Sequence, residues 1–205
     1  MAPTAPAPAR LENRPAATPA TGGSGWRAAV SAVGRRWPTW FAVALATVSL
    51  WDVDDGREYA FLLVLAATGY LFVAVVDRPR TTWPGLFAFT GAVVVFRVAD
   101  LDPMPAMALV AVALVAVGLL AGQLRRPGLP ALQSPAAFGF IALAVVALSV
   151  PAEVGGFLVA AGLLGHAAWD FLHWRANRIV VRSFAEWCGV LDAILGAGIL
   201  LLLLR

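Results

Sequence analysis

The chain has 205 residues, of which 60% are hydrophobic and 13% are charged, and its formal net charge is +3. A soluble domain is about 45–50% apolar and about 25% charged, so one soluble core cannot bury this excess of apolar side chains. The composition therefore predicts an integral membrane protein. All fifteen basic residues are arginines, and most lie in short segments between apolar runs. That distribution is typical of membrane topology signals and excludes the clustered basic face of a nucleic-acid-binding protein.

The chain begins with a segment rich in Ala, Pro, Thr and Gly, residues 1–25. It has no apolar stretch of the kind found in secretory signals. Its bulky apolar content is too low to offset the entropy of ordering it. The sequence predicts a disordered tail over 1–25, followed by a single transmembrane domain over 26–205.

Seven apolar runs follow the tail, and a membrane-spanning helix needs about 20 such residues, with about 17 at the lower end. The breaks between them carry Pro, Gly or charged residues, which end helices. The predicted fold is an all-α bundle of seven transmembrane helices. An alternative with six spans joins residues 134–174 into one re-entrant hairpin. In chain order the seven predicted spans are 37–52, 59–76, 83–99, 104–123, 134–150, 154–174 and 184–204.

Charge alternates between the two sides of the predicted bundle. With seven spans, twelve arginines fall on the side of the N-terminus, and seven acidic residues fall on the other side. An excess of arginine in short loops marks the cytoplasmic side. The sequence thus predicts a multi-pass protein of the cell membrane with a cytoplasmic N-terminus and an external C-terminus.

The sixth predicted span carries three titratable residues, His166, Asp170 and His173. Their spacing of i, i+4 and i+7 places all three on one helix face. An ionisable side chain in the middle of a span costs about 2.5–3.5 kcal/mol on insertion scales, and such groups usually face the interior of the bundle. These residues are therefore predicted to point at neighbouring helices.

The last predicted span adds Glu186 and, about 9 Å farther along the helix axis, Asp192. Consecutive antiparallel helices joined by a short loop are usually neighbours. Small residues would let these two helices approach closely, namely Gly156, Gly162, Gly165, Gly189, Ala193 and Gly196. The sequence predicts one polar cluster in the cytoplasmic half of the membrane.

Acid–base chemistry is the function that this cluster favours. A carboxyl group in an apolar environment can keep its proton near neutral pH and so act as a general acid. Aromatic faces stabilise developing positive charge, which suits alkene protonation in isoprenoid cyclisation or isomerisation. The predicted proton donor is Asp170 or Asp192, the predicted relay is His166 and His173, Glu186 is placed at the cytoplasmic mouth, and the predicted substrate contacts are Trp169, Phe171 and Trp187.

Three other functions stay open. In the first, His166, Asp170 and His173 are metal ligands of a membrane hydrolase, because zinc enzymes use three protein ligands and a water molecule. In the second, the cluster relays protons in a coupled transporter. In the third, it only joins helices through hydrogen bonds. No cofactor is expected outside the metal alternative. The expected partners are a lipid-like small molecule and membrane lipids, without nucleic acid, and a homo-oligomer is left open.

Several functional classes lack their signature residues. The chain has no lysine, so a retinal Schiff base is excluded, and it has no P-loop, dinucleotide-binding glycine pattern or GxSxG motif. The lone Cys188 is expected to be a small apolar filler. The small size, the seven spans and the buried acids resemble membrane-bound terpene cyclases, although no residue motif of that family is matched and no catalytic residue is carried over.

Overall fold

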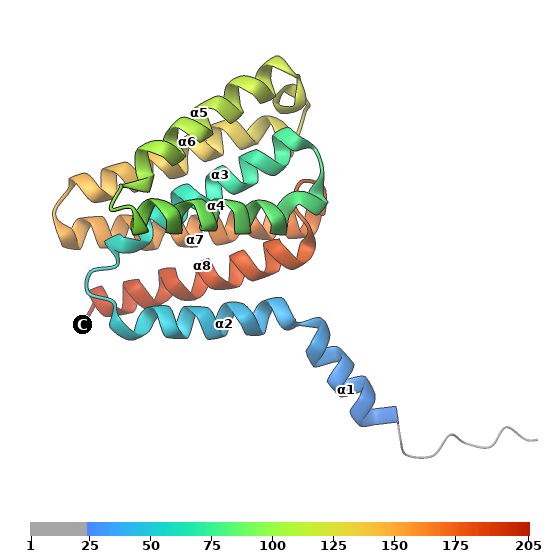
Figure 1. Ribbon diagram of the computed structural model, residues 1–205. Coiled ribbons are helices and arrows are strands. Elements are labelled where there is room, and N and C mark those ends of the chain that lie inside the picture. Colours follow the sequence, from blue (N-terminus) through green and yellow to red (C-terminus); the bar gives the residue numbers. More distant parts are fainter. Residues whose placement is uncertain (1–23) are drawn as a thin grey trace, which may run out of the picture. The chain divides into compact units, whose positions relative to one another are not determined.

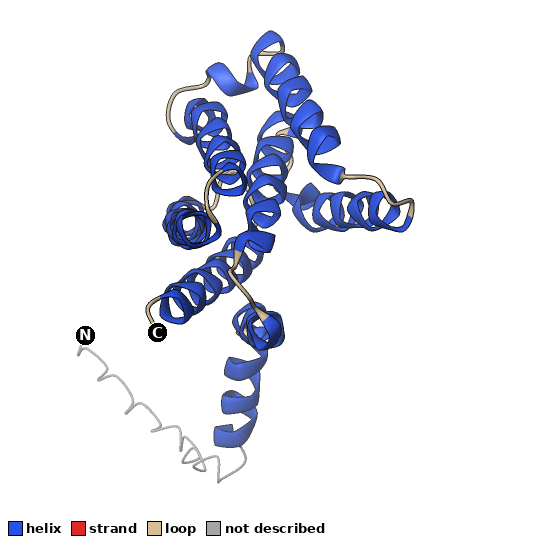
Figure 2. Cartoon of the chain, turned by 90° about the vertical axis from the view of Figure 1, so that its left-hand side faces the viewer, coloured by secondary structure: helices blue, strands red, loops and turns tan. Residues whose placement is uncertain are grey.

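The computed structural model describes residues 24–205, and residues 1–23 of the predicted tail lie outside the described part. The chain divides after Arg36 into two compact units. Helix α1 (Ser24–Arg35) is the described element of the first unit, and it includes the last two residues assigned to the tail. Within residues 24–205 all regular structure is helical, as predicted (Figures 1 and 2).

The second unit is a helical bundle in which each of the seven predicted spans corresponds to one helix. Short 3-10 helices extend the connections between the long helices, over Leu50–Asp52, Arg57–Tyr59, Pro79–Thr81 and Gln123–Arg125. The seven helices are α2 (Trp37–Ser49), α3 (Ala60–Val76), α4 (Thr82–Val98), α5 (Pro103–Leu120), α6 (Leu129–Ser149), α7 (Ala152–Ala176) and α8 (Arg182–Leu203).

Local residue chemistry explains where several of these helices begin and end. Helix α5 begins where the Asp102 side chain accepts a hydrogen bond from the backbone N–H of Met104, with Pro103 in the first turn, where a missing N–H costs nothing. Helices α3 and α7 end at Asp77 and Asn177, both in the left-handed conformation. Such residues close the last turn of a helix and redirect the chain.

Six helical segments are long and apolar enough to cross a membrane, namely α3 and α4 together with the 3-10 turns that precede them, and α5 to α8, which indicates a multi-pass membrane protein. The first predicted span, 37–52, is not among these six segments. Helix α2 has 13 residues, about 20 Å of helix against a hydrocarbon core of about 30 Å, because the chain turns into a 3-10 helix after Ser49. The six-span alternative joined residues 134–174 into one re-entrant hairpin, but α6 and α7 are each long and apolar enough to cross a membrane. A count of seven spans and the orientation of the termini stay predictions.

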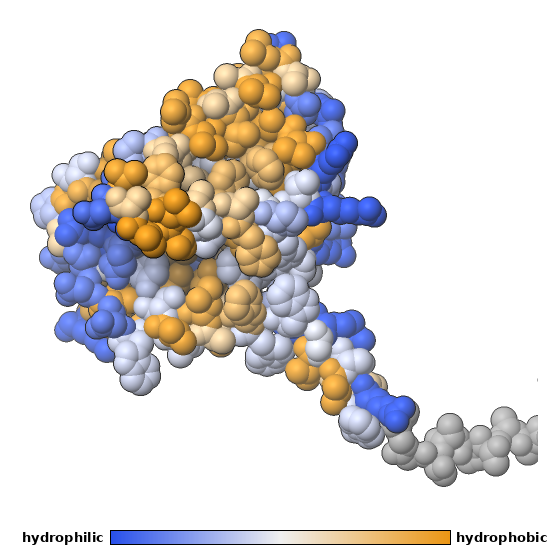
Figure 3. Space-filling view, in the orientation of Figure 1, coloured by the Kyte–Doolittle hydropathy of each residue, from blue (hydrophilic) through white to orange (hydrophobic). Residues whose placement is uncertain are grey.

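The two ends of the bundle differ in charge. Figure 1 shows that the connections after α3, α5 and α7 lie at one end and those after α2, α4 and α6 at the other. The first end carries most of the arginines and the second most of the acidic residues, as the alternating pattern predicts. Asp77 lies at the arginine end, where it pairs with Arg126 at 2.6 Å. Figure 3 shows apolar surface between hydrophilic ends.

Helices α7 and α8 pack along each other, α3 and α6 cover α7, and α2 lies along α8 (Figure 1). Small residues allow α7 and α8 to approach each other closely. A Cβ added at Gly196 would lie 2.9 Å from the Ala160 carbonyl oxygen, and one at Gly189 would lie 3.0 Å from the Asp170 Cβ. Both contacts are too close for a larger side chain, so the predicted close approach of these two helices is confirmed.

Candidate functional site

The polar face of α7 points into the bundle. His166, Asp170 and His173 are all fully buried, in agreement with their helical spacing. Asp192 of α8 is 1% exposed, and its Oδ2 lies 2.8 Å from Nδ1 of His166. The predicted match in depth between α7 and α8 therefore holds for His166 and Asp192.

His166 lies between two carboxyl groups. Its Nδ1 is hydrogen bonded to Asp192 and lies 3.2 Å from Oδ2 of Asp170. The Nδ1 atom is hydrogen bonded to Asp192 only, and Oδ2 of Asp170 has no hydrogen-bond partner among the described residues. On the other side of Asp192, the thiol of Cys188 lies 3.9 Å from Oδ2. One imidazole and one thiol thus contact the same carboxyl group.

Helix α3 contributes Tyr70, which sequence reasoning missed. The Tyr70 hydroxyl donates a short hydrogen bond to Oδ1 of Asp170, and the Tyr70 ring meets the His166 ring edge-on, with centroids 5.4 Å apart. A signal was present in the sequence, because a tyrosine in the middle of an apolar span needs a partner for its hydroxyl. We call Tyr70, His166, Asp170, Cys188 and Asp192 the polar cluster.

His173 lies one turn beyond the polar cluster, with both ring nitrogens engaged elsewhere. Its Nδ1 lies 2.8 Å from the Trp169 carbonyl oxygen, and its Nε2 lies 2.8 Å from the Gln133 amide nitrogen. The carbonyl can only accept, so Nδ1 carries the proton and Nε2 accepts from Gln133 in a neutral ring. The same amide nitrogen donates to the Leu129 carbonyl. The His173 ring packs on Tyr70 with centroids 4.7 Å apart, which positions the tyrosine.

Three polar atoms of the cluster have no hydrogen-bond partner among the described residues: Nε2 of His166, Oδ2 of Asp170 and Oδ1 of Asp192. Buried polar atoms are normally paired, since leaving one unpaired costs about 1–3 kcal/mol. The ion pairs of the described residues bring neither lysine nor arginine to the cluster. The cluster therefore contains buried hydrogen-bonding atoms that the surrounding side chains leave without a partner.

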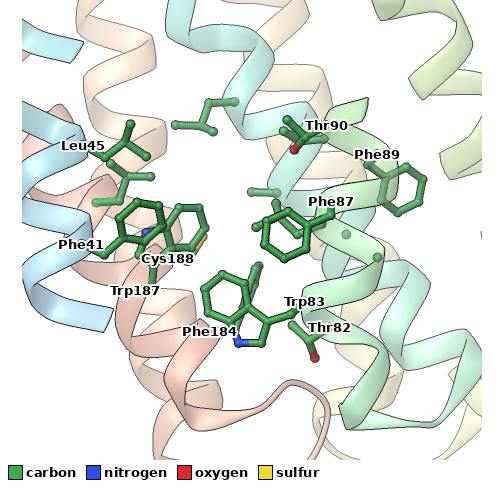
Figure 4. Close-up of a pocket in the computed structure, with 17 residues that line it drawn as sticks. Phe41, Leu45, Thr82, Trp83, Phe87, Phe89, Thr90, Phe184, Trp187 and Cys188 are labelled. Atoms are coloured by element: carbon green, nitrogen blue, oxygen red, sulfur yellow. The ribbon is translucent and has the colours of Figure 1, made fainter. Parts of the chain in front are cut away.

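An apolar cavity of about 300 Å³ lies beside the polar cluster, between α2, α3, α4 and α8 (Figure 4). Aromatic rings from three helices surround it, including Phe41, Trp83 and Trp187. Its wall also includes side chains on the outer surface of the bundle, such as Phe87, which is 68% exposed. The cavity thus reaches the lateral surface of the bundle. Cys188 belongs both to this wall and to the polar cluster.

The predicted aromatic contacts fall in different places. Trp187 lines the apolar cavity and stacks on Phe41. Phe171 is 54% exposed and stacks on Trp174 at the outer surface, because helical neighbours of Asp170 point away from its face. Trp169 packs against His173, with centroids 4.8 Å apart. Of the three predicted substrate contacts, only Trp187 borders this cavity.

Glu186 lies apart from the polar cluster. Its Oε1 accepts a hydrogen bond from the Thr39 hydroxyl at 2.6 Å, which joins α8 to the first turn of α2. The sequence did not predict this contact with α2. A role at the cytoplasmic mouth of the site stays a prediction.

Comparison of the chain with protein-family models, with curated proteins and with solved structures finds no match. The function therefore has to be argued from the cavity and the polar cluster.

Proposed function

We propose that the protein is an enzyme of the cell membrane that acts on a lipid-like or isoprenoid-like substrate by acid–base chemistry, of the cyclase or isomerase type. The proposal rests on the position of Cys188 between the apolar cavity and the polar cluster. Its thiol borders the apolar cavity and lies 3.9 Å from the Asp192 carboxyl. A single side chain therefore separates a buried acid from a space that suits an apolar molecule.

The cavity defines the substrate side of the proposal. Small-molecule sites usually have volumes of about 300–1,000 Å³, and this cavity of about 300 Å³ is at the lower end. Its lining is almost wholly apolar, with Thr82 and Thr90 as its hydroxyl-bearing members. Because it reaches the lateral surface between α2 and α4, a substrate would come from the lipid phase, with an unsaturated hydrocarbon segment inside.

The polar cluster defines the proton side. Asp192 is the acid next to the cavity. The Cys188 thiol donates its proton to an unsaturated carbon of the substrate and takes a proton from Asp192 in return. A new C–H bond forms, and the ring faces of Trp83 and Trp187 stabilise the positive charge on the substrate. Loss of a proton from an adjacent carbon restores the acid, so the net change is an isomerisation or cyclisation without a co-reactant. His166 holds Asp192 in place, and Tyr70 holds Asp170.

Filling the cavity is expected to abolish substrate binding while the polar cluster stays intact. Gly69 lines the cavity, and a Cβ there would meet no atom within 4 Å, so the side chain of a Gly69→Leu variant enters open space without a clash. We expect product formation, followed by mass spectrometry of membrane lipid extracts, to fall about tenfold or more, equivalent to about 1.4 kcal/mol. Gly139→Leu is the matched control, because Gly139 is equally unobstructed but lies away from the cavity. Equal product levels in both variants would contradict the substrate site.

A divalent metal ion is the second candidate, favoured by the unpartnered atoms of the cluster. His166, Asp170, Cys188 and Asp192 each offer one ligand atom, and these four atoms lie within 4.8 Å of one another. Zinc bonds of about 2.0–2.3 Å in a tetrahedron place ligands about 3.3–3.8 Å apart, and the measured separations of 2.8, 3.2 and 3.9 Å bracket that range. Two carboxylates would balance the ion's charge. The ligand set differs from the one expected from the sequence, because His173 is engaged by Gln133.

Metal content separates the two ligand sets. If the ion is bound, elemental analysis of purified protein should give about one metal per chain. A Cys188→Ser variant should then hold cobalt without the near-ultraviolet charge-transfer band of a thiolate ligand, while His173→Gln should keep both cobalt and the band. Loss of metal in His173→Gln would support the ligand set expected from the sequence. Wild-type protein that remains metal-free after incubation with zinc or cobalt would remove the metal function and leave the acid–base proposal.

A further inference from the structure

Helix α1 presents an apolar face that the described residues of its own unit leave uncovered. Every residue from Gly25 to Arg36 is exposed, and three large apolar side chains are more than half exposed, with Trp26 at 64%, Val30 at 59% and Val33 at 55%. These three lie at i, i+4 and i+7, so they form one stripe along the helix. The stripe is a continuous apolar surface about two turns long.

The opposite face of α1 is polar and basic. Arg27, Ser31 and Arg35 lie at i, i+4 and i+8, about a quarter to a half turn away from the stripe, and the Arg35 guanidinium donates to the Ser31 hydroxyl at 3.3 Å. The helix is therefore divided lengthwise into an apolar side and a cationic side. This division is typical of helices that lie in the plane of a membrane interface.

The length of α1 shows that it needs a surface to cover it. The helix has 12 residues, and isolated helices shorter than about 12–15 residues are marginal in water, since nucleation is costly and packing supplies most helical stability. Two of its residues, Gly25 and Gly34, lower its helical propensity further. A helix of this kind is stable only where its apolar stripe is buried.

We infer that α1 lies in the headgroup region of a membrane that contains anionic lipids, with the stripe of Trp26, Val30 and Val33 facing the acyl chains. Charge supports an anionic surface, because residues 24–51 contain arginines but no acidic residue. Each arginine near such a surface adds electrostatic attraction to it. Trp26 is a residue type that prefers this depth. The sequence also continues from α1 into the apolar α2 after one residue, Arg36. This inference is independent of the proposed function.

Spin labels on the full-length protein in liposomes test the placement of α1. On a Cys188→Ala background, single cysteines replace Val30 and Val33 on the stripe, and Ala28 and Ser31 on the polar side. In phosphatidylcholine liposomes that contain phosphatidylglycerol, the labels at 30 and 33 should be accessible to oxygen and protected from a water-soluble nickel chelate. The labels at 28 and 31 should show the reverse.

Charge reversal supplies the control. Adding Arg27→Glu and Arg35→Glu should expose the labels at 30 and 33 to the nickel chelate, as should the omission of phosphatidylglycerol. Equal exposure of all four positions would overturn the inference. Protection at 30 and 33 that is independent of lipid charge and is accompanied by strong immobilisation of the labels would also overturn it, because the stripe would then be covered by protein.

Discussion

An Asp192→Asn variant is expected to lower product formation by roughly 10²–10⁴-fold, the usual contribution of a positioned general acid. Asparagine has nearly the same shape and can still accept a hydrogen bond from His166, now 2.8 Å from Oδ2 of Asp192. It has no proton to give. The loss would therefore report proton transfer rather than a change of fold. Mass spectrometry of lipid extracts from membranes with equal amounts of wild-type and variant protein measures it.

Two further variants sharpen this test. Asp170→Asn should have a smaller effect, because Asp170 is held by the Tyr70 hydroxyl, whereas the Cys188 thiol is directed at Asp192. Asp77→Asn should leave product formation unchanged, since Asp77 pairs with Arg126 at the exposed arginine end. Wild-type levels of product in Asp192→Asn would remove this residue as the proton donor, and a larger loss in Asp170→Asn would transfer that role to Asp170.

A His166→Leu variant is expected to lose about 3–5 kcal/mol of unfolding free energy, the usual cost of removing one partner from a buried ionic group. A lost hydrogen bond alone would cost far less, since hydrogen bonds within membranes average about 0.6 kcal/mol. The larger loss arises because the carboxyl groups of Asp170 and Asp192 would then face each other in an apolar interior without the imidazole that lies between them. Equilibrium unfolding in mixed micelles measures the change.

Replacing all three of His166, Asp170 and Asp192 should restore most of the lost unfolding free energy. A His166→Leu, Asp170→Asn, Asp192→Leu triple variant carries no buried charge, and replacing a complete buried ionic group by apolar residues is often neutral or stabilising. We expect its unfolding free energy to lie close to that of the wild type, with no product formed. If His166→Leu alone is as stable as the wild type, the polar cluster is not an electrostatic unit.

The helices and the polar face of α7 could be predicted from the sequence because each depends on a local pattern. Apolar runs of spanning length, ended by Pro, Gly and charge, define six of the seven helices of the bundle well. The spacing of His166, Asp170 and His173 defines one face of a helix whatever surrounds it. The glycines of α7 and α8 were enough to predict that Asp192 would meet that face.

The partners from other helices could not be predicted in this way. Tyr70 and Gln133 reach the site from α3 and α6, and which helix packs against α7 is decided by tertiary structure. The same reason explains why the contact between Glu186 and Thr39 was not predicted. The apolar cavity was also missed, because apolar side chains that line a space have the same pattern as those that fill a core. The length of α2 depends on where the chain turns after Ser49, for which no helix-ending residue gave a signal.

Incorporation of deuterium from solvent is the most direct test of proton transfer from the enzyme to a lipid. Any lipid that accepts a proton on carbon becomes heavier, whatever its structure. Purified protein in nanodiscs is incubated in D₂O with a neutral lipid extract and a metal chelator, and the lipids are then analysed by mass spectrometry. We expect the wild type to place deuterium on carbon in at least one unsaturated lipid, and we expect Asp192→Asn and Gly69→Leu not to do so. The absence of deuterated lipid with the wild type, or equal labelling by Asp192→Asn, would contradict it.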